Sequence, residues 1–173
     1  MDALDVLKER RSIRSYKEEQ IPLDVLKKIL EAGTYAPTAM NRQTPVIVVI
    51  QNKETIKKLS KMNAKIMNSD GDPFYGAPTL LIVFADSAFP TYVEDGSLVM
   101  GNLLNAAASL GIGSCWIHRA KETFLTDEGK ELMKKWGLGE NYVGIGNCIL
   151  GYAAAQPEAK PRKDGYIIMA DEL

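Results

Sequence analysis

The residues with the clearest chemical potential stand near the start of the chain. Three guanidinium groups and two hydroxyl groups lie within six residues, contributed by Arg10, Arg11, Ser12, Arg14 and Ser15. The planar guanidinium group matches the geometry of a phosphate, and charge-assisted hydrogen bonds are stronger than neutral ones. This run therefore favours a phosphate site. A solvated, charged corner of the surface is the alternative interpretation.

A second basic cluster, which holds Lys160 and Arg162, lies near the other end of the chain. The formal net charge of the whole protein is only −1, so two separate basic clusters are not explained by a generally basic composition. Positive groups from distant parts of a chain often meet at one anionic ligand. We therefore expect the two clusters to converge on a single anionic group.

Two further segments carry groups that could contact a flat, polar ligand. The segment 36–43 is rich in amide and hydroxyl groups, which can donate to and accept from the edge of a heterocycle or a polyol. The segment 111–118 begins with two glycines and could bring backbone N–H groups close to such a ligand. A capped turn is the alternative for the first segment, and a helix end followed by a core strand is the alternative for the second.

Catalysis by a side chain has little support in this sequence. His118 is the single histidine, and it stands without a recognisable partner. Cys115 and Cys148 lie in apolar runs that lack the basic neighbours of a reactive thiolate, so we expect both thiols to be reduced and buried. No hydrolase nucleophile motif, zinc-ligand spacing or phosphate-binding glycine loop is present. We therefore expect no catalytic side chain and no metal, and a bound cofactor that supplies the chemistry.

Length and charge restrict the class of protein. The 173 residues fit one domain, residues 1–173, and can bury a sizeable core. The net charge argues against a nucleic acid or an anionic membrane as partner, and no aromatic residues alternate with the arginines as in single-strand binders. No apolar run approaches the roughly 18 residues that cross a bilayer, and the N-terminal residues lack a signal-peptide core. We expect a cytoplasmic protein.

The apolar pattern predicts helices packed around a central sheet. A short amphipathic helix over residues 2–10 is expected to face inward with Leu4 and Leu7. Further helices are expected over residues 23–33, 53–67, 94–110 and 123–136, and buried strands over residues 46–50, 79–85, 112–117 and 142–152. This order of elements indicates the α+β class, with one mainly antiparallel or mixed sheet surrounded by helices.

Two apolar segments expose more apolar surface than a single small domain can cover. The helix expected over residues 94–110 is apolar almost all round, which is typical of a helix in the centre of a protein or in a subunit interface. The polar tail that begins at residue 153 ends in an apolar run from Tyr166 to Met169. We expect this run to dock on another surface, such as a partner subunit.

Five segments, in order along almost the whole chain, resemble one known family. The run from Arg10 to Tyr16 resembles an RRSxRxY/F motif, and residues 36–43 resemble an APSxxNxQ loop. The runs YGAP at 75–78, LGIGSCW at 110–116, and LGY at 150–152 followed by Lys160-Pro-Arg162 complete the set. These are motifs of the FMN-dependent nitroreductases, and the chain is similar to that family throughout.

The resemblance implies a domain-interlocked homodimer with two FMN molecules in the subunit interface. It assigns Arg10, Ser12, Arg14, Lys160 and Arg162 to the phosphate and the pyrimidine end of the flavin, with Arg11 contributing through its backbone. It places Pro37, Thr38, Met40, Asn41 and Gln43 against the flavin, in part from the opposite subunit. The segment Cys115, Trp116, Ile117 and His118 would run along the ring, with a backbone N–H near the reactive N5.

The implied activity is ping-pong reduction of nitroaromatics, quinones or similar acceptors by NADH or NADPH, with hydride transfer through flavin N5. One departure from the family pattern affects the acceptor site, because Gln43 is followed by Thr44 and Pro45 where the family often has Pro-Trp. Thr38 also replaces the usual serine. A flavin-destroying or dehalogenating branch of the same fold is one rival interpretation. A non-catalytic FMN-binding redox sensor or carrier is the alternative from a different class.

Overall fold

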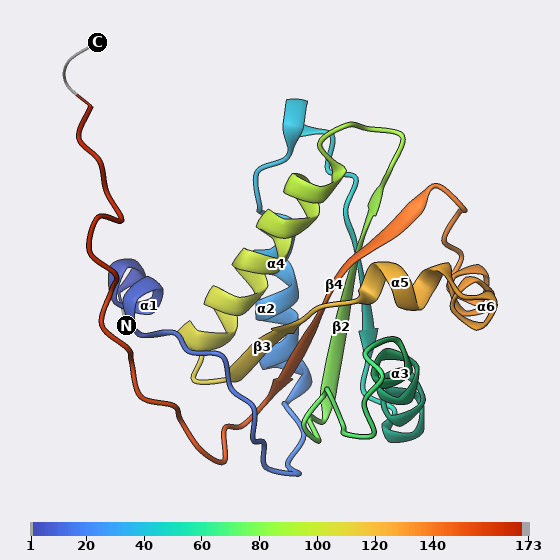
Figure 1. The fold of residues 1–173 in the computed structure, drawn as a ribbon, viewed down its shortest axis with the longest axis horizontal. Coiled ribbons are helices and arrows are strands. Elements are labelled where there is room, and N and C mark those ends of the chain that lie inside the picture. The colour runs from blue at the N-terminus through green and yellow to red at the C-terminus, as the bar shows by residue number, and fades with distance from the viewer. Residues whose placement is uncertain (1, 171–173) are drawn as a thin grey trace.

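A four-stranded antiparallel sheet forms the centre of the protein (Figure 1). The structure is a computed structural model that describes residues 2–170. Within these residues the strands are β1 (Val46–Ile50), β2 (Thr79–Asp86), β3 (Gly113–Ile117) and β4 (Tyr142–Gly151), arranged in the order β1-β2-β4-β3. All three pairings are antiparallel, which confirms the expected α+β class with a mainly antiparallel sheet.

Helices cover both faces of this sheet. The helices α2 (Leu23–Thr34) and α4 (Tyr92–Ser109) pack on one face, and α3 (Lys53–Ile66), α5 (Ala120–Leu125) and α6 (Asp127–Lys135) pack on the other (Figure 1). The short helix α1 (Ala3–Glu9) lies beside the C-terminal end of α4, and a single 3-10 turn, η1 (Ala39–Asn41), precedes β1. Among residues 2–170, no helix is both long enough and apolar enough to cross a membrane.

Strand β2 divides the core into two hydrophobic clusters. Residues 80–85 of β2 are fully buried. Leu81, Val83 and Ala85 belong to the cluster under α2 and α4, whereas Leu80, Ile82 and Phe84 belong to the cluster under α3, α5 and α6. This alternation follows from the two-residue period of a strand, and it explains why β2 is apolar at every one of these positions.

Residues 46–50 form a strand, as expected. The expectation that this strand is buried is wrong, because most of its residues are only partly buried. β1 lies at the edge of the sheet, where it pairs with β2 alone among the described residues. Ile50 is buried, but Val49 is 41% exposed. An edge strand packs one side against a neighbour and leaves the other open, so its apolar residues are only partly covered.

The single helix expected over residues 123–136 is also wrong, because two helices occupy this region. The break falls at Thr126, whose backbone is extended and whose hydroxyl oxygen accepts from the N–H of Gly129 at 3.1 Å. A threonine in this position caps a new helix. Gly129 permits the tight turn, because a Cβ there would lie 2.2 Å from the carbonyl oxygen of Thr123.

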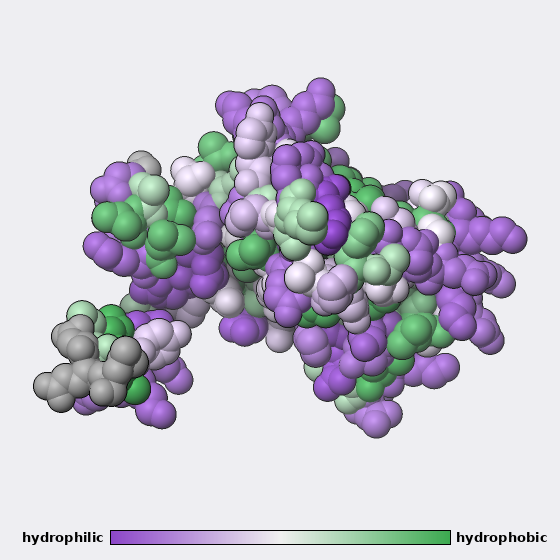
Figure 2. Space-filling view, turned by 90° about the horizontal axis from the view of Figure 1, so that it is seen from above, coloured by the Kyte–Doolittle hydropathy of each residue, from purple (hydrophilic) through white to green (hydrophobic). Residues whose placement is uncertain are grey.

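The orientation expected for α1 is wrong as well. Leu4 and Leu7 are 62% and 60% exposed, and Val6 is the residue that is buried. Helix α1 packs on α4 along one side only, so its two leucines lie outside the core of the single chain. Figure 2 shows apolar surface gathered around α1, at the left of the view.

Helix α4 and the tail leave further apolar surface uncovered. Helix α4 buries Val99, Met100 and Leu103 against the sheet, while Leu98 on its other side is 47% exposed. The apolar run of the tail, residues 166–169, is exposed along its whole length and extends away from the body of the protein (Figure 1). The single chain therefore buries α4 on one side only.

Candidate functional site

The arginine-rich segment is attached to the beginning of β3. Ser12 forms a parallel bridge with Ser114, and the N–H of Ile13 donates to the carbonyl oxygen of Ser114 at 2.9 Å. Ile13 is buried, whereas Arg14 is exposed and Arg10 is half-buried. Burial of the isoleucine therefore anchors the segment and leaves its cationic groups at the surface beside β3.

Arg11 differs from its two neighbours. Its Nη1 donates to the carbonyl oxygens of Lys8 and Arg10, at 2.7 and 2.9 Å. The last carbonyl groups of a helix lack partners within the helix, so this side chain satisfies the end of α1. The side chain of Arg11 is thus engaged locally through Nη1.

The start of the C-terminal tail runs alongside the same segment. Tyr16 bridges Ala153, and the N–H of Ala154 donates to the carbonyl oxygen of Ser15 at 2.9 Å. A cavity of about 190 Å³ lies between the arginine-rich segment, the end of α4 and the tail, with Gly113 and Gln156 in its lining. The sequence separates the arginine-rich segment from the start of the tail by more than 130 residues, and the sheet brings them together.

The second basic cluster lies farther along the tail. Lys160 and Arg162 are both exposed, and Nη2 of Arg162 donates to the carbonyl oxygen of Lys160 at 3.2 Å. No hydrogen bond or ion pair among residues 2–170 connects this cluster to the arginine-rich segment. Two cationic clusters that share an anion need no contact with each other, so their convergence on one anionic group stays a prediction.

The segment 115–118 forms most of β3 and the residue after it. Cys115 faces the cluster under α3 and α5, Trp116 packs toward α4, Ile117 is buried and His118 is exposed. Trp116 lies close against β4, because a Cβ at Gly146 would be 2.6 Å from its Nε1. The glycine allows this contact, which holds the end of β3 against the sheet.

Two buried asparagines that the sequence analysis did not assign hold the end of β3. Asn63 on α3 is 1% exposed, and its Nδ2 donates to the carbonyl oxygen of His118 at 2.9 Å. Asn147 on β4 is 3% exposed, and its Nδ2 donates to the carbonyl oxygens of Ile117 and His118 at 3.3 and 3.4 Å. An amide inside an otherwise apolar strand was the available signal at residue 147.

Titratable groups beside this segment are held in their neutral forms. Burial raises the pKa of the Tyr16 hydroxyl well above its usual range, the nearby thiols of Cys115 and Cys148 raise it further, and Arg14 opposes the shift. The Tyr16 hydroxyl donates to the carbonyl oxygen of Ile13 at 2.8 Å. Burial, with a smaller effect of Cys115, likewise raises the pKa of the Cys148 thiol. Both cysteines are free and buried, as expected.

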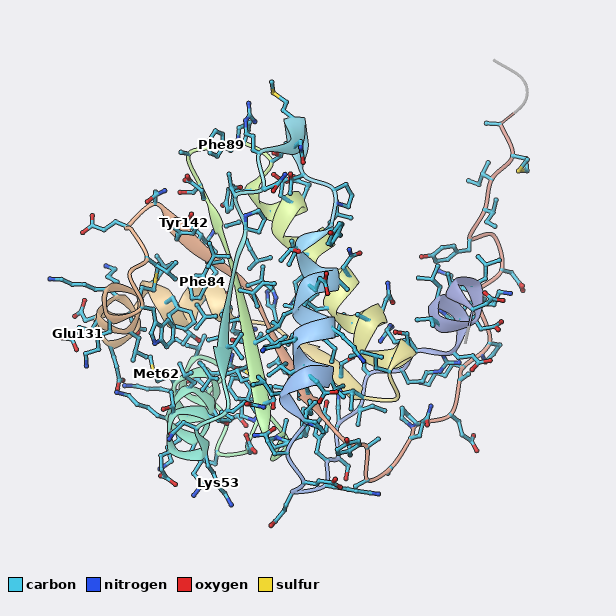
Figure 3. The ribbon with its side chains drawn as sticks, turned by 180° about the vertical axis from the view of Figure 1, so that it is seen from behind. Lys53, Met62, Phe84, Phe89, Glu131 and Tyr142 are labelled. Atoms are coloured by element: carbon cyan, nitrogen blue, oxygen red, sulfur yellow. The ribbon has the colours of Figure 1, made fainter. Side chains whose placement is uncertain are left out.

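The loop 36–43 is anchored at the opposite end of α4. The N–H of Ala39 donates at 2.9 Å to Oδ1 of Asp95, a buried carboxylate that also accepts from the hydroxyl of Thr91 at 3.3 Å. The guanidinium group of Arg42 lies over the ring of Phe89 at 4.7 Å, and joins the loop to the segment before α4 (Figure 3). Asp95 is a further residue that the sequence analysis missed.

The backbone of this loop is unusual. Met40, Asn41 and Gln43 all have φ close to 52°, in the left-handed region that residues other than glycine seldom adopt. The N–H of Gln43 donates to Oγ1 of Thr38 at 3.0 Å, and Nε2 of Gln43 donates to Oδ1 of Asn41 at 2.9 Å. These bonds hold the strained turn, while Pro37, Met40, Asn41 and Gln43 remain exposed.

The two parts of the predicted site do not meet within one chain. The loop is attached at Asp95, whereas the arginine-rich segment lies near Ala108, which is 13 residues farther along α4. At about 1.5 Å per residue, the two attachment points are about 20 Å apart. The structure thus groups the arginine-rich segment with residues 115–118 and the start of the tail, and separates the loop from them.

A larger cavity than the one beside β3 lies elsewhere. A cavity of about 630 Å³ lies between α5, α6 and the start of β4, where Glu131 and Tyr142 line it (Figure 3). None of the predicted cofactor-binding residues lines this cavity. The predicted site and this cavity are therefore separate places on the chain.

Comparison with known proteins identifies the family. A model of the family described as "Nitroreductase family" matches residues 7–152. The chain belongs to the nitroreductase family. The match covers the arginine-rich segment, the loop and all four strands.

Solved structures and a curated relative agree with this assignment. A nitroreductase of Bacteroides fragilis NCTC 9343 with bound FMN has a TM-score of 0.90 and 32% identity, over 98% of each chain. A nitroreductase of Desulfitobacterium hafniense DCB-2 with bound FMN has a TM-score of 0.85 and 28% identity, over 98% of this chain and 99% of that one. The Bacillus subtilis (strain 168) protein named FMN reductase, NAD(P)H, is 25% identical over 184 residues, 93% of this chain and 70% of the relative.

Proposed function

We propose that the protein is an FMN-dependent NAD(P)H oxidoreductase. The observation that carries the proposal is the pairing of Ser12 with Ser114, which puts the arginine-rich segment beside β3, the strand that ends at Ile117. Among residues 2–170, no carboxylate pairs with Arg10 or Arg14, so two positive groups are free to meet a phosphate. The FMN in two structures of the family supports the same cofactor here.

The basic residues would hold the phosphate and the pyrimidine end of the cofactor. Arg10, Ser12 and Arg14 supply donors beside β3, and Arg11 supplies its backbone because its side chain is engaged at the end of α1. Guanidinium groups bind phosphate in a bidentate manner, which orients the ligand as well as holding it. Lys160 and Arg162 would join them from the tail.

The remaining contacts would come from a second copy of the chain. The loop that holds Pro37, Thr38, Met40, Asn41 and Gln43 is attached to α4 about 20 Å from the point where the arginine-rich segment lies, which favours contact with a different copy of the site. A homodimer in which each loop reaches the partner's β3 would complete the site. The exposed apolar faces of α1 and α4 and the exposed apolar run of the tail support such an interface.

The segment Cys115, Trp116, Ile117 and His118 would lie along the flavin ring and exclude water from one side of it. Bound FMN supplies hydride transfer from NADH or NADPH through N5 to a nitroaromatic, quinone or similar acceptor. The protein contributes binding, orientation and fixed hydrogen-bond donors, and no side chain acts as an obligatory acid, base or nucleophile. Donor and acceptor would use the same site in turn, in a ping-pong sequence.

The test is anaerobic reduction of the purified protein. The protein loaded with FMN should lose the visible absorption band of its oxidised flavin when NADH or NADPH is added. Double-reciprocal plots with a quinone or nitroaromatic acceptor should then give parallel lines. Tight FMN binding without reduction by either nucleotide would refute the proposal and would indicate the non-catalytic sensor or carrier instead.

A further inference from the structure

The two buried asparagines determine the direction of one peptide group. A carbonyl oxygen only accepts hydrogen bonds, so the NH2 groups of Asn63 and Asn147 must face the carbonyl of His118. Both side chains are buried, and the carbonyl therefore points into the protein. The ring of His118 itself is exposed, which places this peptide at the boundary between the core and the surface.

The other side of the same peptide points outward. The His118–Arg119 peptide is trans, so the N–H of Arg119 points in the direction opposite to the carbonyl of His118. Within residues 2–170, no backbone or side-chain acceptor takes this N–H. Arg119 has φ 75°, in the left-handed region, so the peptide is held in a conformation that L residues seldom adopt without support.

We infer that Asn63 and Asn147 are positioning residues that hold the His118–Arg119 peptide so that its N–H is presented to the bound cofactor. The inference rests on the proposed function, in which residues 115–118 lie along the flavin. A donor held rigidly before the reaction stabilises developing charge, whereas a mobile donor must first be ordered. Each asparagine acts through the peptide, by its hydrogen bond to the carbonyl of His118.

The side-chain carbonyl oxygen of Asn63, which has no hydrogen-bond partner among the described residues, supports this role. This oxygen, Oδ1, is buried. A buried acceptor without a partner destabilises a fold, and an apolar side chain of similar size would fill the same space without that loss. The amide is therefore poorly explained by stability alone, and its contact with the carbonyl of His118 gives it a function.

The test replaces each asparagine with leucine, which has a similar volume and no donor. With FMN bound and NADH or NADPH saturating, Asn63→Leu and Asn147→Leu should each reduce the flavin about tenfold more slowly or worse, with little change in KM, because positioned donors contribute chiefly to the transition state. The absorption band of bound FMN should also shift. The double variant should lose little more than either single variant, because both side chains act through one peptide.

Two controls separate positioning from loss of stability. Cys148→Ala removes a buried side chain next to Asn147 on the opposite face of the sheet, so it should lower the melting temperature while leaving the spectrum and the reduction rate unchanged. Asn63→Asp can still donate to the carbonyl when protonated. Its reduction rate relative to wild type should therefore be highest at low pH and fall as the carboxyl group ionises.

The outcomes are distinct. Leucine variants that bind FMN with an unchanged spectrum and the wild-type reduction rate would overturn the inference, as would a loss no larger than that of a Cys148→Ala variant of equal melting temperature. A pH-independent Asn63→Asp ratio would also contradict it. Failure of the wild-type flavin to accept electrons would refute the proposed function instead, and the spectral comparison of the variants would still decide the role of the asparagines.

Discussion

The buried carboxylate of Asp95 gives the most direct test of how the loop 36–43 is held. We expect Asp95→Ala to release this loop from α4, because Asp95 accepts from the N–H of Ala39 and from the hydroxyl of Thr91. The side chain is 3% exposed and lies in the first turn of α4, where the helix dipole favours a negative charge. Alanine removes both acceptors and leaves the N–H of Ala39 without a partner.

The expected magnitude follows from these contacts. A hydrogen bond to a charged group contributes about 1.5–3 kcal/mol, and the helix dipole adds about 0.3–1 kcal/mol. Removing a buried carboxylate also recovers part of its desolvation energy, so we expect a net loss of about 2 kcal/mol for Asp95→Ala. Asp95→Asn keeps an acceptor for Ala39 and loses only the charge, so its loss should be about 1 kcal/mol.

The assay is urea unfolding of both variants and wild type without FMN, followed by titration with FMN. The free energy of unfolding should fall in the order wild type, Asp95→Asn, Asp95→Ala. FMN binding should weaken about tenfold for Asp95→Ala if the loop contributes to the cofactor site. Two variants within about 0.5 kcal/mol of wild type would refute the reasoning, because a buried carboxylate with two donors cannot then anchor the loop.

Three further perturbations address the site, the core and the assembly. Arg14→Ala and Arg162→Ala should each weaken FMN about tenfold and riboflavin less, since riboflavin lacks the phosphate; equal losses by calorimetry would contradict a phosphate role. The pKa values of Tyr16 and Cys148 are raised in the folded state, so the folded protein keeps protons that the unfolded chain loses above about pH 8.5 to 10. The free energy of unfolding should therefore fall between about pH 9 and 11, by about 1.4 kcal/mol per pH unit for each group, and Tyr16→Phe should flatten the upper part of the fall; a stability independent of pH in this window would exclude the linkage. Ending the chain before Tyr166 should dissociate the proposed dimer and release FMN together, and a truncated monomer that sediments with a full complement of flavin would disprove the shared site.

The number of strands and their approximate positions could be predicted because each strand is a short apolar run bounded by turn residues. The partial exposure of β1 could not be predicted, because an edge strand and a central strand can have the same local sequence. Whether Val49 is covered depends on the order of strands in the sheet, which local periodicity does not contain. The burial of β2 was easier to predict. Both faces of this strand pack against the core, which requires an uninterrupted apolar run.

The break between α5 and α6 was predictable in principle. Thr126 followed by Asp127 and Glu128 is the residue pattern of a helix start, and it was hidden by the apolar spacing that continues through it. The orientation of α1 was harder to predict. Its leucines have the spacing of an inward face, and only the tertiary contact with α4 selects Val6 for burial.

In the candidate site, too, local features could be predicted and contacts between distant residues could not. Residue types indicated the arginine-rich segment and the amide-rich loop, because their chemistry is local. Contacts between residues far apart in the sequence could not be predicted this way. Asn63 reaches the carbonyl of His118 across 55 residues, and Asp95 reaches Ala39 across 56. Each of these pairs depends on helix packing that the sequence does not display.

The shared position of β2 has a consequence for how the protein loses its structure on heating. Because successive residues of this strand serve opposite hydrophobic clusters, neither helical layer can leave without baring one side of a fully buried strand. The two layers are therefore thermodynamically coupled, and the calorimetric and van't Hoff enthalpies of the folded subunit should agree. Cavities made on either side, at Leu81 or at Ile82, should lower one common transition rather than create a separate early one.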